Sequence, residues 1–432
     1  MKIALNSVLE EFQWRELVAD CTSEADVAAL TTKPTAVYCG FDPTADSLHV
    51  GSLVPLMALK RFQLLGHTPI ALIGGATGMI GDPSGKSKER NLLDPDTLNQ
   101  NVRAVSAQIT AFLGPQAKVV NNADWLKNMG FLEFLLDVGK HFSVNQMLTK
   151  DSVKSRMGEE NGISYTEFSY QIVQAFDFYN LAKNHDCRLQ IGGSDQWGNI
   201  TAGIDLTRKK TGIQVVGLTM PLVLTAAGTK FGKTEAGTIW LDKAKTSEHD
   251  FYQFWIHTDD RDVIKYLKMF TLLPKEQIHA LTQEHLKNPA GRQAHNALAE
   301  NMTELVHGPQ VVQKMTAGSS IFLRPANEFS SEELNALSAQ VPGIRVPNTE
   351  EVLGKRLQEI VHAVQLTTSK SEARRVIEQG GITLNDQRIN DPAYVIKATD
   401  FLQGKFLILG KGKKNIAMLT SKAPVKAIPS IH

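Results

Sequence analysis

The chain has 432 residues, of which 42% are hydrophobic and 21% charged, and its formal net charge is +1. This composition is that of a soluble globular protein and excludes a disordered or fibrous chain. The near-zero charge excludes a uniformly basic surface for nucleic acid, although local basic patches remain open. Because the length exceeds what one core usually supports, we expect two or three domains.

Cysteine usage and the N-terminus indicate where the protein works. The three cysteines, Cys21, Cys39 and Cys187, lie far apart and form no CxxC pair. Neither a disulfide framework nor a zinc site is indicated, and no residue is assigned as a metal ligand. The N-terminal segment carries neither an apolar signal region nor an Arg/Ser-rich presequence, and no apolar run reaches about 18 residues. We therefore expect a cytoplasmic protein with no membrane segment.

The first half of the chain alternates β-rich runs with amphipathic helical patterns. Strands are expected at residues 36–41, 69–73, 188–191 and 214–218, and helices at 51–65, 97–113, 124–140, 167–183 and 196–210. Such alternation is typical of an α/β fold with a doubly wound, Rossmann-like parallel sheet covered by helices on both faces. Ligands of such sheets bind at the carboxyl ends of the strands.

The second half changes character twice. From about residue 247 to 316 strand signals vanish and helical patterns take over, whereas 317–350 contains three prolines and predicts a connection with one helix at 331–338. In residues 366–390, Ser369 and Glu372 have capping-box spacing before a helix that is followed by two glycines and a turn. The predicted division is a catalytic domain (1–229), a helical domain (230–325), a linker (326–350) and a small basic C-terminal domain (351–432).

The segment YCGFDPTADSLHVGSL, residues 38–53, runs from a strand through a polar turn into a helix. His49, Gly51 and Ser52 stand at the start of that helix. Unpaired N–H groups and a partial positive charge at a helix start bind phosphate, and a histidine there can donate to a reacting phosphate. The alternative for this segment alone is an ordinary capped helix with a chance histidine.

The segment KFGKT, residues 230–234, lies in a loop bounded by Gly228 and Gly237. Two lysines three residues apart can neutralise a triphosphate, although the segment by itself favours a solvated basic loop. A His-x-Gly helix start and a Lys-x-x-Lys-Ser/Thr loop in one α/β domain are the paired signatures of class I aminoacyl-tRNA synthetases. Together the two motifs favour nucleotide chemistry.

Five strings resemble bacterial-type tyrosyl-tRNA synthetases in order and spacing: YCGFDPTADSLHVGSL, GGATGMIGDPSGKSKER, SYQIVQAFDF, IGGSDQWGNITAG and KFGKT. Residues 357–396 are similar to the α-L RNA-binding module that ends these enzymes. The resemblance implies activation of L-tyrosine by ATP with Mg²⁺, release of pyrophosphate and transfer of tyrosine to the 3′ end of tRNA(Tyr). It also implies a symmetric homodimer.

The resemblance assigns roles in the amino-acid pocket. Tyr38 and Asp177 would bind the phenol hydroxyl, Asp82, Tyr170 and Gln174 would hold the α-ammonium group, and Gln196 would contact the tyrosine carboxylate or adenylate. Tyr170, Gln174 and Asp177 are spaced i, i+4, i+7 and therefore share one helix face. Ordinary amphipathicity would produce the same spacing, but a carboxylate that faces a domain core needs a partner.

The remaining assignments concern ATP. Its contacts would come from Cys39, Gly40, Asp42, His49, Gly51, Ser52, Gly193, Asp195 and Lys233. The groups around the reacting phosphates would be Thr44, His49, Lys86, Arg90, Lys230, Lys233 and Thr234. The family commonly has a second histidine where this chain has Ser52, and a serine reaches the ribose from a shorter arm.

The C-terminal region carries a basic cluster. Residues 403–432 contain six lysines and no acidic residue. We expect tRNA contacts from Arg374, Arg375, Lys411, Lys413 and Lys414, because phosphate binding by lysine and arginine dominates RNA affinity. A solubilising surface is the alternative.

Two other functions fit parts of this pattern. A tryptophanyl-tRNA synthetase shares the fold and the loop, but indole offers no hydroxyl to the pair of Tyr38 and Asp177. A noncatalytic RNA-binding descendant would keep the scaffold, but His49, Lys230 and Lys233 are all present. The sequence therefore favours tyrosine activation over both.

Overall fold

The computed structural model describes residues 8–84, 93–159, 162–229, 231–234, 237–320, 325–338, 341, 343–412 and 415–424. The chain divides into two compact units, Met1–His307 and Gly308–His432. Among the described residues, no helix combines the length and the apolar character needed to cross a bilayer.

The first unit is built on a six-stranded sheet of order β1-β6-β5-β2-β3-β4. Its strands are β1 (Asp20–Cys21), β2 (Ala36–Phe41), β3 (Thr68–Ile73), β4 (Lys118–Asn121), β5 (Cys187–Gly193) and β6 (Val216–Met220). All neighbours pair in parallel except β1, which pairs antiparallel with β6 at the edge. The predicted doubly wound sheet is confirmed. The direction of winding reverses between β2 and β5, and such a reversal opens a crevice at the carboxyl ends of the two strands.

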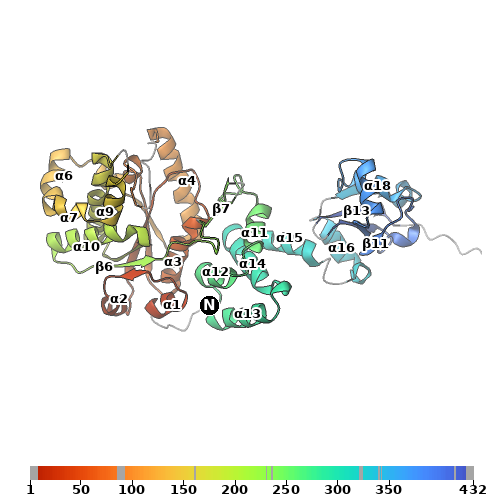
Figure 1. Cartoon of the computed structure of the whole chain (residues 1–432), viewed down its shortest axis with the longest axis horizontal. Coiled ribbons are helices and arrows are strands. Elements are labelled where there is room, and N and C mark those ends of the chain that lie inside the picture. Colours follow the sequence, from red (N-terminus) through yellow and green to blue (C-terminus); the bar gives the residue numbers. More distant parts are fainter. Residues whose placement is uncertain are drawn as a thin grey trace, which may run out of the picture. The chain divides into compact units, whose positions relative to one another are not determined.

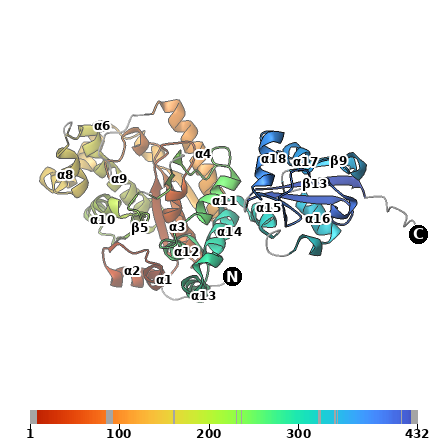
Figure 2. The same cartoon turned by 45° about the vertical axis from the view of Figure 1, so that its right-hand side comes forward.

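Four long helices flank this sheet. They are α3 (Leu53–Leu64), α4 (Pro95–Leu113), α9 (Tyr165–Asn184) and α10 (Trp197–Thr211). Helices α9 and α10 lie on one face, and α3 and α4 lie on the other (Figures 1 and 2). Local chemistry explains their limits. Asp94 caps the start of α4 and Ser164 caps that of α9, whereas Gly212 ends α10 in the left-handed conformation with φ 72°.

The single helix predicted at residues 124–140 is wrong. The chain forms α5 (Ala123–Leu126), α6 (Phe131–Asp137) and a short 3₁₀ turn, Gly139–His141. Gly130 breaks the run because it stands in extended conformation at the start of α6, where its N–H donates to the Glu133 carboxylate at 3.4 Å. The short helices α1 (Val8–Trp14), α2 (Glu24–Leu30), α7 (Val144–Leu148) and α8 (Asp151–Met157) were not expected.

The predicted helical region follows the sheet. After the hairpin of β7 (Lys233–Thr234) and β8 (Gly237–Thr238), the first unit continues with α11 (Glu248–Ile256), α12 (Val263–Phe270), α13 (Lys275–Lys287) and α14 (Gln293–His307). Helix α15 (Pro309–Ser320) belongs to the second unit. Phe251, Trp255 and Phe270 are fully buried in the core of the helices.

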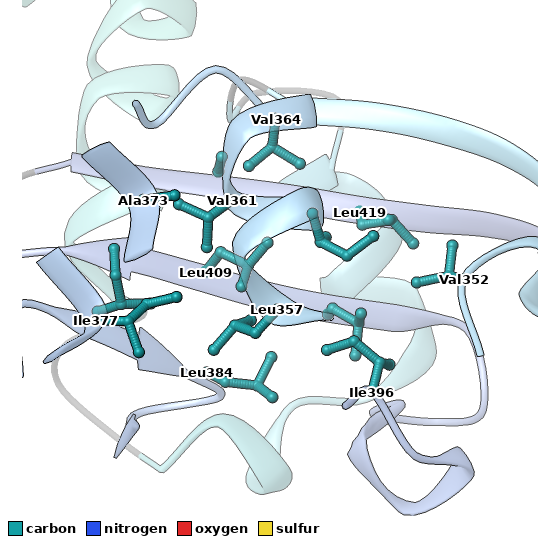
Figure 3. Packing of buried hydrophobic residues seen from close by; sticks show 14 of the residues in the cluster. Val352, Leu357, Val361, Val364, Ala373, Ile377, Leu384, Ile396, Leu409 and Leu419 are labelled. Carbon is teal, nitrogen blue, oxygen red and sulfur yellow. The ribbon is translucent and has the colours of Figure 1, made fainter. Parts of the chain in front are cut away.

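The second unit has a five-stranded sheet of order β11-β10-β12-β13-β9. The elements are α16 (Ser331–Ser338), β9 (Gly343–Asn348), α17 (Leu357–Ala363), α18 (Lys370–Glu378), β10 (Ile382–Leu384), β11 (Gln387–Ile389), β12 (Phe406–Lys411) and β13 (Asn415–Ala423). Alternate residues of β12 face opposite sides. Leu407 and Leu409 join the core under α17 and α18, whereas Phe406 and Ile408 join the cluster that includes Leu334 of α16. Figure 3 shows Leu409 among the side chains of the first core.

The predicted linker, residues 326–350, contains part of this second unit. Strand β9 pairs in parallel with β13, and Leu334 and Leu337 of α16 are buried against the sheet. The alternating pattern of β9 was obscured by Pro347, which an edge strand tolerates because one row of its N–H groups needs no partner. This segment therefore contributes a strand and a helix to the folded unit instead of only connecting two domains.

Candidate active site

The residues of the predicted amino-acid pocket, apart from Asp82 in the loop after the 3₁₀ turn Thr77–Met79, come from three elements at the crevice between β2 and β5. Tyr38 lies in β2, while Gln196 ends a 3₁₀ turn (Ser194–Gln196) that directly follows β5. Helix α9 contributes Tyr170, Gln174 and Asp177 from one face, as their spacing predicts. The fold thus places these side chains where an open α/β sheet binds its ligand.

Asp177 is 1% exposed, and both of its carboxylate oxygens accept hydrogen bonds. Asn122 donates from Nδ2 to Oδ2 at 3.0 Å, and Trp125 donates from Nε1 to Oδ1 at 2.8 Å. Burial raises the pKa of Asp177 to about 7, although both hydrogen bonds oppose the shift. The carboxyl group therefore changes charge near neutral pH.

Tyr38 is 1% exposed, and its hydroxyl group is buried without a hydrogen-bond partner. The ring packs edge-on against Phe178 at 5.2 Å between centroids. Burial, followed by the nearby carboxylate of Asp177, raises the pKa of Tyr38 well above its ordinary value. An unpaired buried hydroxyl costs about 1–3 kcal/mol, so a ligand that supplies its partner recovers free energy.

A second hydrogen-bond network joins Asp82, Gln174 and Gln196. Gln196 donates from Nε2 to Asp82 Oδ2 at 2.6 Å and accepts at Oε1 from Gln174 Nε2 at 3.2 Å. Asn199 Nδ2 donates to Gln174 Oε1 at 3.0 Å and to Gln196 Oε1 at 3.2 Å. Asn199 was missed as a site residue, although it lies in the string IGGSDQWGNITAG.

In the free protein Tyr170 is hydrogen-bonded to Asp42, a residue that the resemblance assigns to ATP. Its hydroxyl donates to Asp42 Oδ2 at 3.2 Å, and Thr77 Oγ1 donates to Asp42 Oδ1 at 3.2 Å. Burial raises the pKa of Tyr170 well above its ordinary value, and the carboxylates of Asp42, Asp82 and Asp177 raise it further. Asp42, which was assigned to ATP, therefore lies beside the amino-acid pocket. Three carboxylates around one neutral phenol suit a cationic ligand group.

His49 caps the short helix that leads into α3. Its Nδ1 accepts from the N–H of Gly51 at 3.0 Å, which places the ring hydrogen of a neutral imidazole on Nε2. A Cβ on Gly51 would lie 2.7 Å from the His49 ring, so only glycine allows this arrangement. The ring also lies edge-on to Trp240, at 6.1 Å between centroids.

The two nucleotide motifs lie beside each other. The N–H of Val50 donates to the carbonyl of Ile239 at 3.0 Å, and Ile239 donates to Gly232 of KFGKT at 3.2 Å. Gly232 has φ 84°, and a Cβ there would lie 2.7 Å from Val50. The backbone of Lys233 and Thr234 forms β7. Lys86, Arg90 and Lys230 lie outside the described residues.

The other predicted nucleotide contacts surround the ends of β2 and β5. Cys39 is 3% exposed, and burial raises the pKa of its thiol to about 12, so the group stays neutral. Gly40 faces open space, since a Cβ there would meet no atom within 4 Å. At Gly193 a Cβ would lie 2.4 Å from Asp195. Thr44 is exposed, and Ser52 is half-buried at the start of α3.

Comparison with known proteins identifies the family. A family model described as tRNA synthetases class I (W and Y) matches residues 30–324, and one described as tyrosine–tRNA ligase SYY-like C-terminal domain matches residues 333–419. The tyrosine–tRNA ligase of Bacillus caldotenax is 48% identical, with 95% of this chain and 99% of the relative covered. The chain belongs to the tyrosine–tRNA ligase family.

Further relatives agree with this membership. Tyrosine–tRNA ligase 1 of Bacillus licheniformis is 46% identical, with 97% of this chain and 100% of the relative covered. A crystal structure of a C-terminally truncated mitochondrial tyrosyl-tRNA synthetase from Aspergillus nidulans has a TM-score of 0.66 and 32% identity, covering 74% of this chain and 94% of that one. The resemblance drawn from the five strings is confirmed, and the chain is an aminoacyl-tRNA synthetase.

The residues predicted to contact tRNA belong to the second unit. Arg374 and Arg375 are exposed on α18, and Lys411 at the end of β12 forms an ion pair with Glu372 of α18 at 2.8 Å. Lys411 and the Thr368 hydroxyl hold the pKa of Glu372 at about 2. Arg374 and Arg375 thus lie on one helix and Lys411 is paired with it, while Lys413 and Lys414 lie outside the described residues.

Proposed function

We propose that the pocket between β2 and β5 selects L-tyrosine through Tyr38 and Asp177. Members of this family activate tyrosine with ATP and charge tRNA(Tyr) with it. The Asp177 carboxylate would accept the phenol hydrogen of the substrate, and the Tyr38 hydroxyl would donate to the phenol oxygen. The observation that carries the assignment is the buried, unpaired hydroxyl of Tyr38 beside a carboxylate whose pKa is raised.

The other end of tyrosine would lie against the carboxylates and amides. Its ammonium group would be held by Asp82, Tyr170 and Gln174, with Asp42 supporting Tyr170 through their hydrogen bond. Gln196, whose amide is held by Gln174 and Asp82, would contact the tyrosine carboxylate. We add Asn199, which orients both glutamines.

ATP would lie across Cys39, Gly40, Gly51, Ser52, Gly193 and Asp195. The tyrosine carboxylate attacks the α-phosphorus in line, pyrophosphate leaves, and the adenylate acylates the terminal ribose of tRNA. His49 would donate from Nε2 to the α-phosphate as its charge rises, with Thr44 beside it. The side chains of Lys86, Arg90, Lys230, Lys233 and Thr234 would neutralise pyrophosphate.

We propose Mg²⁺ as the ion that neutralises triphosphate oxygens during this reaction. The described residues contain no group of three or more His, Cys, Asp or Glu side chains that could hold a metal, so the ion would be held mainly by the triphosphate itself. The protein itself needs no nucleophile, so its part is orientation and stabilisation of charge. We place the reaction in the cytoplasm.

Pyrophosphate exchange with purified protein tests the proposal. Exchange that depends on tyrosine, with phenylalanine and tryptophan inactive, is the expected result. Tryptophan activity would contradict the assignment of Tyr38 and Asp177 while leaving the fold and chemistry intact. No exchange with any of the three amino acids would favour a noncatalytic RNA-binding role.

For tRNA we propose the surface formed by Arg374, Arg375 and Lys411, with Lys413 and Lys414. Replacing Arg374 and Arg375 with glutamine should raise the KM for tRNA and weaken its salt dependence, because each lost phosphate contact removes about one unit of the salt slope. Pyrophosphate exchange without tRNA should not change. A loss of exchange would show that the substitutions disturb the catalytic unit instead.

We propose a homodimer that forms through an exposed apolar face on the first unit. Its exposed side chains are Phe131, Leu132, Leu135, Leu136, Val144, Met157 and Tyr165. Exposed apolar side chains concentrated in one stretch of chain indicate an interaction surface, and a second copy offers the same side chains about a two-fold axis.

The double variant Leu132→Asp with Leu136→Asp should be monomeric by light scattering. Leu286→Asp is the control, since Leu286 is equally exposed, at 70%, on α13. An unchanged dimer in the double variant would refute this interface.

A further inference from the structure

Helix α12 (Val263–Phe270) ends against a buried arginine of the sheet domain. Arg61, on α3, is 2% exposed, and its Nη2 donates to the carbonyls of Lys268 at 3.3 Å, Met269 at 2.9 Å and Thr271 at 2.8 Å. Carbonyls at a helix C-terminus lack partners within the helix and carry partial negative charge. Arg61 thus caps α12 from a different element.

A second arginine reinforces this cap. Arg15 is also 2% exposed; its Nη1 donates to the carbonyls of Lys268 at 2.9 Å and Thr271 at 3.1 Å, and its Nη2 donates to Leu273 at 2.8 Å. Glu11 forms an ion pair with Arg15, and its carboxylate also lies near the Arg61 guanidinium. The end of α12 is therefore fixed both to α3 and to the residue directly after α1.

Side chains of α12 also contact the KFGKT segment. Phe231, 5% exposed, stacks on Phe270 with 5.0 Å between centroids and 22° between planes, and it meets Tyr266 edge-on at 5.0 Å. Asp262, directly before α12, accepts from the N–H of Ala226 at 2.7 Å. One helix therefore anchors the chain on the N-terminal side of KFGKT and a residue within it.

Arg61 and the first nucleotide motif share one rigid element. Helix α3 begins at Leu53, directly after the turn that His49 caps. At about 1.5 Å per residue, Arg61 lies roughly 12 Å from Leu53 along the helix axis. A continuous path of packed groups runs from His49 through α3 and Arg61 to α12, and from α12 through Phe270 to Phe231. We infer that Arg61 is a positioning residue that holds the KFGKT segment in register with the His49 motif.

Stabilisation of the fold alone is a poor explanation for this side chain. Nε and Nη1 of Arg61 are buried without hydrogen-bond partners, and burial lowers the pKa of the guanidinium well below its ordinary value. A buried guanidinium carries a desolvation cost that an apolar residue of similar volume would not have. What the arginine adds is direction, since its Nη2 bonds fix where α12 ends relative to α3. The inference rests on the proposed roles of the two nucleotide motifs.

The test compares Arg61→Met and Arg61→Lys with Lys60→Met. Lys60, the neighbouring residue of α3, donates to the carbonyls of Phe112 and Leu113 at the end of α4, both at 3.3 Å, so it caps a helix that does not carry KFGKT. Adenylate formation is measured in single turnover against ATP concentration and normalised to titrated active sites. Tyrosine affinity is measured without ATP.

We expect Arg61→Met to lower the rate constant of adenylate formation about tenfold while tyrosine affinity stays within about twofold, since changes in packed networks alter coupling by this order. Arg61→Lys should recover part of the rate, and Lys60→Met should match the wild type. An Arg61→Met protein with the wild-type rate per active site would overturn the inference. So would an equal loss in Lys60→Met.

Phe270→Leu tests the same path if Arg61→Met fails to fold. It should lower the rate without changing tyrosine affinity, and an unchanged rate would overturn the inference. Combined with Arg61→Lys it should show less than the sum of the two effects, because both act through α12. Lys233→Ala distinguishes a failure of this inference from a failure of the proposed function. If it abolishes exchange while the α12 variants behave as wild type, the proposed function stands and only the inference fails.

Discussion

Replacing Tyr38 with phenylalanine should change stability and specificity in opposite directions. In the free protein the Tyr38 hydroxyl is buried and unpaired, a state that costs about 1–3 kcal/mol, while the ring contact with Phe178 survives the change. We therefore expect the free energy of unfolding to rise by about 1 kcal/mol. With tyrosine bound, the variant lacks one hydrogen bond worth about 0.5–1.5 kcal/mol, which lowers kcat/KM for tyrosine about 2- to 12-fold.

Phenylalanine provides the internal control for this variant. It has no hydroxyl to lose, so its kcat/KM should stay unchanged and the preference for tyrosine should fall by the same factor of about 2–12. The assays are thermal unfolding of the free protein, with an expected rise of about 2 °C, and pyrophosphate exchange with each amino acid. A loss of stability greater than about 1 kcal/mol would show that the hydroxyl has a partner in the free protein. An unchanged preference would remove Tyr38 from the selection of substrate.

Three other variants test the buried charges. The pKa of Asp177 rises from 3.8 to about 7 on folding, so the folded state binds more protons between these values and stability should fall as pH rises from about 4 to 7. Tyrosine needs the carboxylate, so its Kd should rise about tenfold at one pH unit below the pKa, and Asp177→Asn should abolish both trends. Trp125→Phe removes a donor to that carboxylate and should move the pH dependence of tyrosine binding upward. Arg156→Met leaves the buried Glu167 unpaired, which should lower the free energy of unfolding in urea by about 3–5 kcal/mol, with recovery when Glu167→Gln is added.

Groupings of site residues within one helix could be predicted from the sequence, whereas contacts between residues of different elements could not. Tyr170, Gln174 and Asp177 lie on one face of α9 because helical spacing alone determines it. Asn122, a partner of Asp177, directly follows β4. All four residues of this strand are partly or fully exposed, and its sequence has no long apolar run that would have predicted a strand. The role of Asn122 depends on the order of strands in the sheet, which no local pattern records. Arg61 was not singled out for the same reason, since its partners lie more than 200 positions away.

A pocket that selects by polarity has to be less stable than an apolar one. The hydroxyl of Tyr38 discriminates only if it lacks a partner until the substrate arrives, because a partner within the protein would satisfy it for any ligand. The Asp177 carboxylate also costs stability in the free protein, but it has two hydrogen-bond partners there. Asn122 and Trp125 keep it from being fully protonated at neutral pH, but its pKa near 7 leaves its charge sensitive to what enters the pocket. Stability given up in the free pocket and preference gained for tyrosine therefore come from the same two groups, and a variant that raises one should lower the other.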